Sequence, residues 1–176
     1  MTTLLGIPGA LRRESTNRKL AREAARLFEP DHYIEADLRL PLFDQDLEDA
    51  SGVPPEVMRL AEQIESADAV VISTPEYNKA LPGVLKNALD WISRTGKAPL
   101  KDKPTAIVSA ADGRGGGDRA QFSLRLALVM FRPRLLQGPE VMIADSRNAF
   151  DDEGRLKDEN SRKFLRALMD ELRKMT

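Results

Sequence analysis

Short apolar runs alternate with longer amphipathic stretches along the whole chain. The apolar runs predict five strands, at about Thr3–Ile7, Tyr33–Asp37, Ala69–Ser73, Thr105–Ala110 and Glu140–Ile143. Elsewhere, apolar residues recur at the spacing of a helix. This period predicts helices at about Ser15–Phe28, Pro54–Ser66, the segment after Pro82, Arg119–Phe131 and Glu159–Lys174. Strict alternation of strands and helices favours a parallel sheet with helices on both faces.

Five parallel strands joined through helices suit an α/β three-layer sandwich. Right-handed crossovers limit the topology, and the flavodoxin-like strand order 2-1-3-4-5 fits this number of strands. In that order the carboxyl ends of strands 1, 3 and 4 are neighbours, and ligands bind in the crevice between strands 1 and 3. We expect a single domain over residues 1–176, because this length favours one domain and no internal repeat is visible.

The most informative stretch runs from Val70 to Trp91. An apolar run ends at Thr74, the polar loop Pro75-Glu76-Tyr77-Asn78 follows, and Pro82 stands where a helix can begin. Loops at the carboxyl ends of strands are where α/β proteins bind ligands. The four loop residues also suit an ordinary turn, so this loop alone leaves both interpretations open.

The loop after the first predicted strand has the features of a phosphate site. Gly9 permits a tight turn, and Ser15 and Asn17 are residue types that cap helices. A helix N-terminus presents free N–H groups and partial positive charge, and Arg12 adds a cation. A plain capped helix with a solvated Arg12 is the alternative.

A glycine-rich loop follows the fourth predicted strand, over Ser109–Asp118. Glycines let a ligand approach the backbone closely, although a glycine run is also common in ordinary loops. Asp118 is expected to cap the following helix. Three loops at adjacent strand ends would surround one crevice, which fits a phosphorylated planar ligand.

The composition narrows the chemistry available to the side chains. The chain has no cysteine and one histidine, His32. Disulfides, thiolate zinc sites and cysteine nucleophiles are excluded, and a histidine triad or metal site would depend on His32. We expect His32 to be a surface or edge residue, and we expect no metal site. Redox chemistry would require a borrowed cofactor.

The balance of charge and hydropathy excludes other classes. The chain has 27 basic and 28 acidic residues, which are interspersed, so nothing predicts binding to nucleic acid or to an acidic membrane. No apolar run approaches the length of a membrane span, and we expect a cytoplasmic protein. The strongly apolar stretch Phe122–Phe131 favours contact with a second subunit. Packing of Met130 and Phe131 under the loop Arg132–Pro139 is the alternative.

These motifs resemble the NADPH-dependent FMN reductase family, including its quinone-, azo- and chromate-reducing members. The resemblance is carried by Gly9–Asn17, by the Thr-Pro-Glu-Tyr-Asn and Pro-Gly-x-Leu-Lys-Asn-Ala-x-Asp-Trp motifs within Thr74–Trp91, and by Leu40–Asp46 and Phe150–Leu156. It implies a flavodoxin-like fold that binds FMN non-covalently, in a homodimer or homotetramer, with NADPH or NADH as reductant.

The resemblance also implies roles for individual residues. The FMN phosphate would be held by Arg12, Ser15 and Asn17. The ribityl chain and isoalloxazine would be lined by Pro75, Glu76, Tyr77 and Asn78, and the flavin would be flanked by Ser109 and Gly113. Ala10 replaces the family's serine in the phosphate loop. The lost hydroxyl predicts weaker FMN binding, because a hydrogen bond to a charged group contributes about 1.5–3 kcal/mol.

The implied function is hydride transfer from NAD(P)H through flavin N5 to a small-molecule acceptor, namely a quinone, free flavin, azo compound or similar. No side chain is assigned as catalytic, since the flavin carries the chemistry. Tyr77 is a candidate contact for the ring or the substrate, with simple packing as the alternative. The competing function is a non-catalytic FMN-binding electron carrier or sensor, which would bind FMN without turnover of NAD(P)H.

Overall fold

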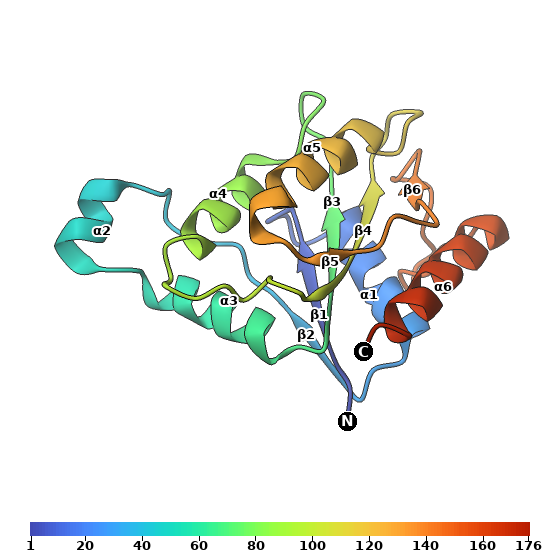
Figure 1. Cartoon of the computed structure of the whole chain (residues 1–176). Coiled ribbons are helices and arrows are strands. Elements are labelled where there is room, and N and C mark those ends of the chain that lie inside the picture. The colour runs from blue at the N-terminus through green and yellow to red at the C-terminus, as the bar shows by residue number, and fades with distance from the viewer.

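The computed structural model describes residues 1–176 and contains one parallel sheet. Its strands are β1 (Thr3–Pro8), β2 (His32–Glu35), β3 (Ala69–Thr74), β4 (Pro104–Ala110), β5 (Arg134–Leu135) and β6 (Met142–Ile143). The order is β2-β1-β3-β4-β5, with β6 also paired to β4, and every pair is parallel. The predicted order 2-1-3-4-5 is confirmed (Figure 1).

The fifth position of the sheet differs from the prediction of one strand at Glu140–Ile143. Two short strands occupy the same edge of β4: β5 pairs with Pro104–Thr105, and β6 pairs with Ser109–Ala110. Pro139 lies between them and has no N–H to donate to a ladder. The single fifth strand was therefore wrong in its bounds, and the sheet has six strands.

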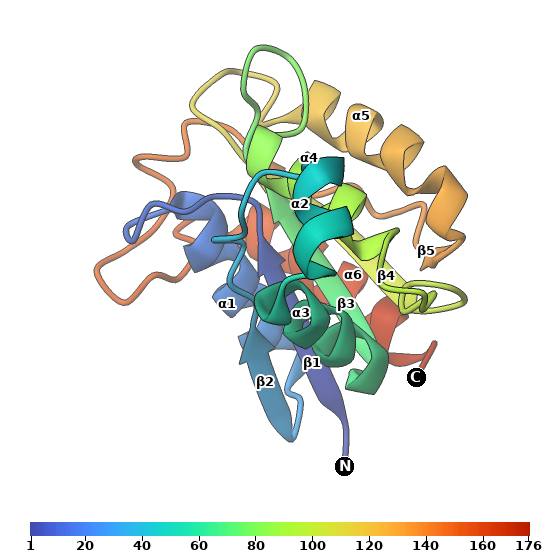
Figure 2. The same cartoon turned by 90° about the vertical axis from the view of Figure 1, so that its left-hand side faces the viewer.

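Helices cover both faces of the sheet. On one face lie α1 (Thr16–Phe28) and α6 (Glu159–Arg173), and on the other lie α3 (Pro55–Ser66), α4 (Gly83–Ile92) and α5 (Asp118–Leu128) (Figures 1 and 2). Leu4 packs with the α1 and α6 side and Leu5 with the opposite side, as the two-residue period of a strand requires. The predicted three-layer sandwich is confirmed.

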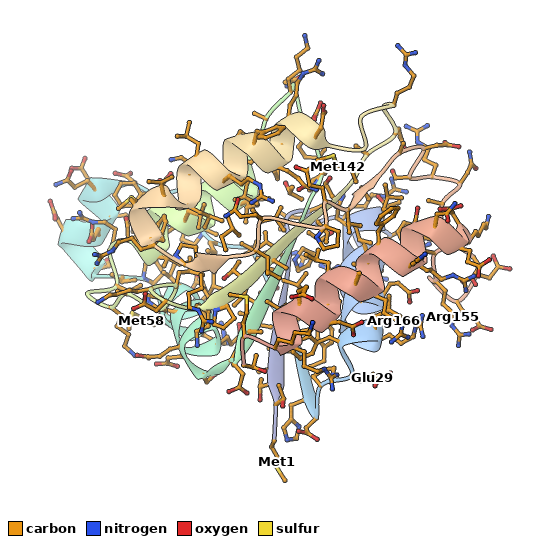
Figure 3. All side chains as sticks on the ribbon, turned by 45° about the vertical axis from the view of Figure 1, so that its right-hand side comes forward. Met1, Glu29, Met58, Met142, Arg155 and Arg166 are labelled. Atoms are coloured by element: carbon orange, nitrogen blue, oxygen red, sulfur yellow. The ribbon has the colours of Figure 1, made fainter.

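The helices α1 and α6 lie side by side (Figure 3). Glu29, at the C-terminal end of α1, lies near Arg166 of α6, with 4.0 Å between its Oε1 and the Arg166 Nη1. Arg173 also donates a hydrogen bond from Nη2 to the Glu29 carbonyl oxygen. These contacts join the last helix to the first, at the end of the sheet opposite the loops described below.

One helix was not predicted: α2 (Gln45–Ser51) projects from the body of the molecule (Figure 1). None of its residues is buried, so it has no apolar stripe for the hydrophobic period to detect. Its preceding segment is held by α4, because the Pro41 carbonyl oxygen accepts from Asn87 Nδ2 at 2.9 Å and from Trp91 Nε1 at 2.8 Å. The second half of the Thr74–Trp91 motif therefore serves the scaffold.

The predicted helix over Arg119–Phe131 ends at Leu128 and continues as a 3-10 turn, Val129–Phe131. Met130 is 68% exposed, so it does not pack under the loop Arg132–Pro139. Phe131 packs partly against the core. No helix in the structure combines the length and the apolar character needed to cross a membrane.

Candidate functional site

A cavity of about 660 Å³ opens at the carboxyl ends of β1, β3 and β4, the upper end of the sheet in Figure 1. This volume lies in the ordinary range for small-molecule and cofactor sites. The predicted residues that line it are Ala10, Arg12, Ser15, Asn17, Pro75, Glu76, Tyr77 and Gly113. Asn78 and Ser109 were also predicted and do not line it. The three loops do surround one crevice.

The N-terminus of α1 forms one wall of this cavity. Ser15 caps the helix, and its Oγ accepts a hydrogen bond from the Asn17 N–H at 3.2 Å. The N–H groups of Ala10, Arg12 and Thr16 have no acceptor within the chain. Free N–H groups and the positive end of a helix are suited to bind a phosphate.

The side chain of Asn17, which the resemblance assigns to the FMN phosphate, makes its hydrogen bonds within the protein. Its side chain is almost fully buried, and Nδ2 donates to the Ala110 carbonyl oxygen at 2.8 Å. Its Oδ1 accepts from the Ala110 N–H and from the Ser73 hydroxyl, each at 3.0 Å. Asn17 therefore braces the start of α1 against the ends of β3 and β4, with its amide oxygen already satisfied by the protein.

Ser109, which was predicted to flank the flavin, lies behind the glycine-rich loop and does not line the cavity. Its hydroxyl donates to the Gly116 carbonyl oxygen at 2.7 Å and accepts from Gln121 Nε2 at 2.9 Å. Gly117 has a φ of +98°, and a Cβ there would lie 2.8 Å from the Ser109 Cβ. The position of Ser109 in β4 turns its side chain toward the glycine-rich loop, and its hydroxyl holds that loop in place.

Asn78 lies in the tight turn at the tip of the loop after β3. Tyr77 and Ala80 exchange backbone hydrogen bonds around it, each 3.1 Å long. Its φ of +51° is left-handed, a conformation that asparagine tolerates better than most residues. Asn78 therefore shapes the turn that places Tyr77 at the rim, where Tyr77 is 55% exposed.

The N-terminus of α5 forms the opposite wall, and its cap comes from another loop. Glu76 Oε2 accepts hydrogen bonds from the N–H groups of Arg119 at 3.1 Å and Ala120 at 3.3 Å. Asp118 was predicted as the cap, but the N-cap residue is Gly117 and no side chain of α5 caps the helix. A carboxylate 43 residues away satisfies these donors and ties the two loops together.

The charges around the cavity are balanced in number but not in their partners. Arg12, Arg114 and Arg119 line it, and none of them forms an ion pair with a protein carboxylate. Glu76, Asp112 and Asp118 also line it. The N–H groups of α5 satisfy Glu76, Arg147 neutralises Asp112, and Asp118 forms no ion pair, so three unpaired cations face one unpaired carboxylate. Unpaired cations in a cleft attract an anionic ligand.

Asp112 belongs to a short hydrogen-bonded chain that sequence reasoning missed. Its Oδ1 accepts from the Ser146 hydroxyl at 2.9 Å, and its Oδ2 lies 2.5 Å from Arg147 Nε. The Ser146 bond, with the Arg147 charge and backbone N–H, lowers the pKa of the Asp112 carboxyl below its usual value. Ser146 in turn accepts from Thr16 Oγ1 at 3.3 Å. Ser146 follows β6, and no local motif marks it as a lining residue.

Known proteins with similar sequences are described as FMN reductases or quinone reductases. The sequence matches the profile of the NADPH-dependent FMN reductase family over residues 2–148. An NAD(P)H-dependent FMN reductase of Pseudomonas aeruginosa is 47% identical over 164 residues, which span 92% of this chain and 88% of that protein. A quinone reductase of Pseudomonas putida is 40% identical over 170 residues, or 93% of this chain and 89% of that protein.

A solved structure extends the likeness to three dimensions. The flavoenzyme NAD(P)H:(acceptor) oxidoreductase of Paracoccus denitrificans superimposes with a TM-score of 0.88 at 32% identity. The alignment covers 99% of this chain and 97% of that one.

Proposed function

This chain belongs to the NADPH-dependent FMN reductase family, and we propose that it is an FMN-dependent NAD(P)H oxidoreductase that reduces a small-molecule acceptor such as a quinone. The observation that carries this proposal is the cavity at the strand ends. An open helix N-terminus and unpaired arginines meet there beside backbone-rich loops.

The residues present fit a phosphorylated flavin. The free N–H groups at the start of α1 and the Arg12 guanidinium match a phosphate. The backbone of the glycine-rich loop can lie close to a planar ring, because Gly113, Gly115 and Gly116 line the cavity without side chains. The replacement of serine by Ala10 removes one donor and leaves the others in place.

In this proposal the bound flavin supplies the chemistry of hydride acceptance and onward electron transfer. The chain binds and orients it. Arg12 and Ser15 hold the phosphate end, while Pro75, Glu76 and Tyr77 form the wall beside the ring. The hydrogen bonds that the Glu76 carboxylate accepts from the α5 N–H groups fix the separation of this wall from the glycine-rich loop. Tyr77, exposed at the rim, is the candidate contact for the ring or an acceptor.

The test is an anaerobic spectrum of the FMN-loaded protein before and after NADPH, and again after a quinone. The proposal expects loss of the visible flavin band with NADPH and its return with quinone. NADH is tested in parallel. Bound FMN that neither nicotinamide reduces would favour the electron carrier or sensor, and failure to bind FMN would overturn the proposal.

The assembly and the choice of acceptor form part of the same proposal. A homodimer or homotetramer is supported by exposed apolar side chains along α5 and its continuation, Phe122, Leu126, Val129 and Met130. Light scattering during size-exclusion chromatography measures the assembly. A panel of quinones, free flavins and azo compounds ranks the acceptors. A single cooperative unfolding transition would support one domain over residues 1–176, and cell fractionation tests the expected cytoplasmic location.

A further inference from the structure

Arg147 lies outside the cavity but is bonded to its wall. Its Nε lies 2.5 Å from Asp112 Oδ2, and its backbone N–H donates to Asp112 Oδ1 at 3.2 Å. Asp112 lines the cavity, whereas the Arg147 side chain is 82% exposed and faces solvent. Arg147 therefore does not contact a ligand in the cavity, and its charge acts beside the carboxylate that it holds.

Asp112 is close to the end of the cavity that suits a phosphate. Thr16, the first residue of α1, donates from Oγ1 to Ser146 Oγ at 3.3 Å, and Ser146 donates to Asp112 Oδ1 at 2.9 Å. Thr16 Oγ1 therefore lies no farther from Asp112 Oδ1 than the sum of these two hydrogen-bond lengths. Ser146 is buried and lines the cavity, so this chain forms part of the wall.

A carboxylate at this distance acts on an anion at the α1 N-terminus. The Debye length is about 8 Å at physiological ionic strength, so the repulsion of a phosphate by Asp112 is only partly screened. Arg147, which does not line the cavity, places a positive charge against the same carboxylate and offsets the repulsion. The offset depends on the charge of the ligand, so it acts on the phosphate and not on an uncharged flavin.

We propose that Arg147 is a specificity-determining residue: by neutralising Asp112, it lets the site select a flavin carrying a phosphate over the same flavin without one. This inference rests on the proposed function, since it concerns the flavin site. Arg12 attracts the phosphate directly, and Arg147 removes the opposing charge.

The experiment measures dissociation constants of the flavin-free protein for FMN and for riboflavin, by quenching of flavin fluorescence. We expect Arg147→Gln to weaken FMN binding by about three- to tenfold and to leave riboflavin binding unchanged. In an Asp112→Asn background the same Arg147→Gln change has a smaller effect on FMN, because the exposed Arg147 side chain is no longer held at the cavity wall. Arg147→Lys keeps the charge and the wild-type ratio of the two constants. The effect of Arg147→Gln shrinks at high salt.

Arg155→Gln is the matched control, because Arg155 pairs with the surface carboxylate of Glu153 and does not line the cavity. Equal loss of FMN and riboflavin affinity in Arg147→Gln would overturn the inference, because it would show that the pair only holds the loop. An unchanged FMN affinity in that variant would overturn it as well. A wild-type protein that binds neither flavin would contradict the proposed function itself. Unchanged riboflavin binding also shows that the variant is folded.

Discussion

The helices α1 and α5 begin on opposite walls of the same cavity, and their N-termini are used in different ways. Each N-terminus carries unsatisfied N–H groups and partial positive charge. At α1 the cap is the local Ser15, and the Thr16 N–H remains without an acceptor. At α5 the Glu76 carboxylate from another loop takes up the N–H groups of Arg119 and Ala120.

The N-terminus of α1 can therefore bind an external anion, whereas the N-terminus of α5 connects two parts of the protein. The α1 N-terminus keeps donors for a ligand, whereas the α5 N-terminus is occupied by an anion of the protein itself. Of the two helix N-termini, only that of α1 therefore offers free N–H groups to a phosphate. The helix α5 makes the cavity rigid, because the Glu76 cap at its N-terminus fixes the loop after β3 to the end of the glycine-rich loop.

The largest expected effect comes from removing the brace of the α1 wall. Asn17→Ala leaves the Ser73 hydroxyl and the Ala110 N–H and carbonyl groups without their buried partner. We expect the free energy of unfolding to fall by about 3 kcal/mol, measured by urea titration. Asn160→Ala, at an exposed position of α6, is the control and should change it little. A loss below about 1 kcal/mol in Asn17→Ala would mean that the brace is dispensable.

Removing the positive charge of Arg12 from the α1 wall should affect ligand binding more than the stability of the fold. Arg12→Ala should weaken FMN binding by about tenfold or more, because a hydrogen bond to a charged group contributes about 1.5–3 kcal/mol. Fluorescence titration measures it. Arg13→Ala is matched in type and position, but Arg13 is outside the lining and should leave FMN affinity unchanged. Equal losses in the two variants would point to general charge attraction.

Removing the cap of the α5 wall tests the other half of the comparison. Glu76→Ala should reduce stability by about 1 kcal/mol, as loss of a helix cap does, and should speed hydrogen exchange at the Arg119 and Ala120 amides. Asp118→Ala removes the carboxylate that does not cap the helix and should have the smaller effect. The opposite ranking would show that Asp118 dominates in solution.

The smallest expected effect is a gain. Ala10→Ser restores a hydroxyl donor beside the α1 N-terminus, and we expect FMN to bind a few-fold more tightly, by up to about 1 kcal/mol. Ala111→Ser adds a hydroxyl elsewhere in the lining and serves as control. If Ala111→Ser improves binding as much, the position of the donor is immaterial and the special role of the α1 wall is contradicted.

The sequence predicted the layers and the strand order because buried strands and amphipathic helices leave regular apolar periods. The departures occur where that signal is weak. The helix α2 has no buried residue, and β5 and β6 are each two residues long on either side of Pro139. Short edge pairs are fixed by the neighbouring strand rather than by their own composition.

In the candidate site, hydrogen bonds between residues close in sequence were predictable, whereas those between residues far apart in sequence were not. The cap at Ser15 follows from residue type and position, and the structure has it. The partners of Glu76, Asn17 and Ser146 lie 43, 93 and 130 residues away, at Arg119, Ala110 and Thr16. Asp118 was the better local candidate for the α5 cap, but the loop after β3 places a carboxylate nearer to the free donors.

The projecting helix α2 has a consequence for proteolysis. The segment before it is joined to the body through the Pro41 carbonyl and through the N–H and ring of Phe43. The helix itself is joined by the ion pair of Glu48 with Arg94, and none of its own residues is buried. Opening this segment exposes little apolar surface, so local unfolding there costs less than opening the sheet. A protease should therefore cut first within residues 45–51. Because no residue of α2 lines the cavity, the nicked protein should still bind its ligand.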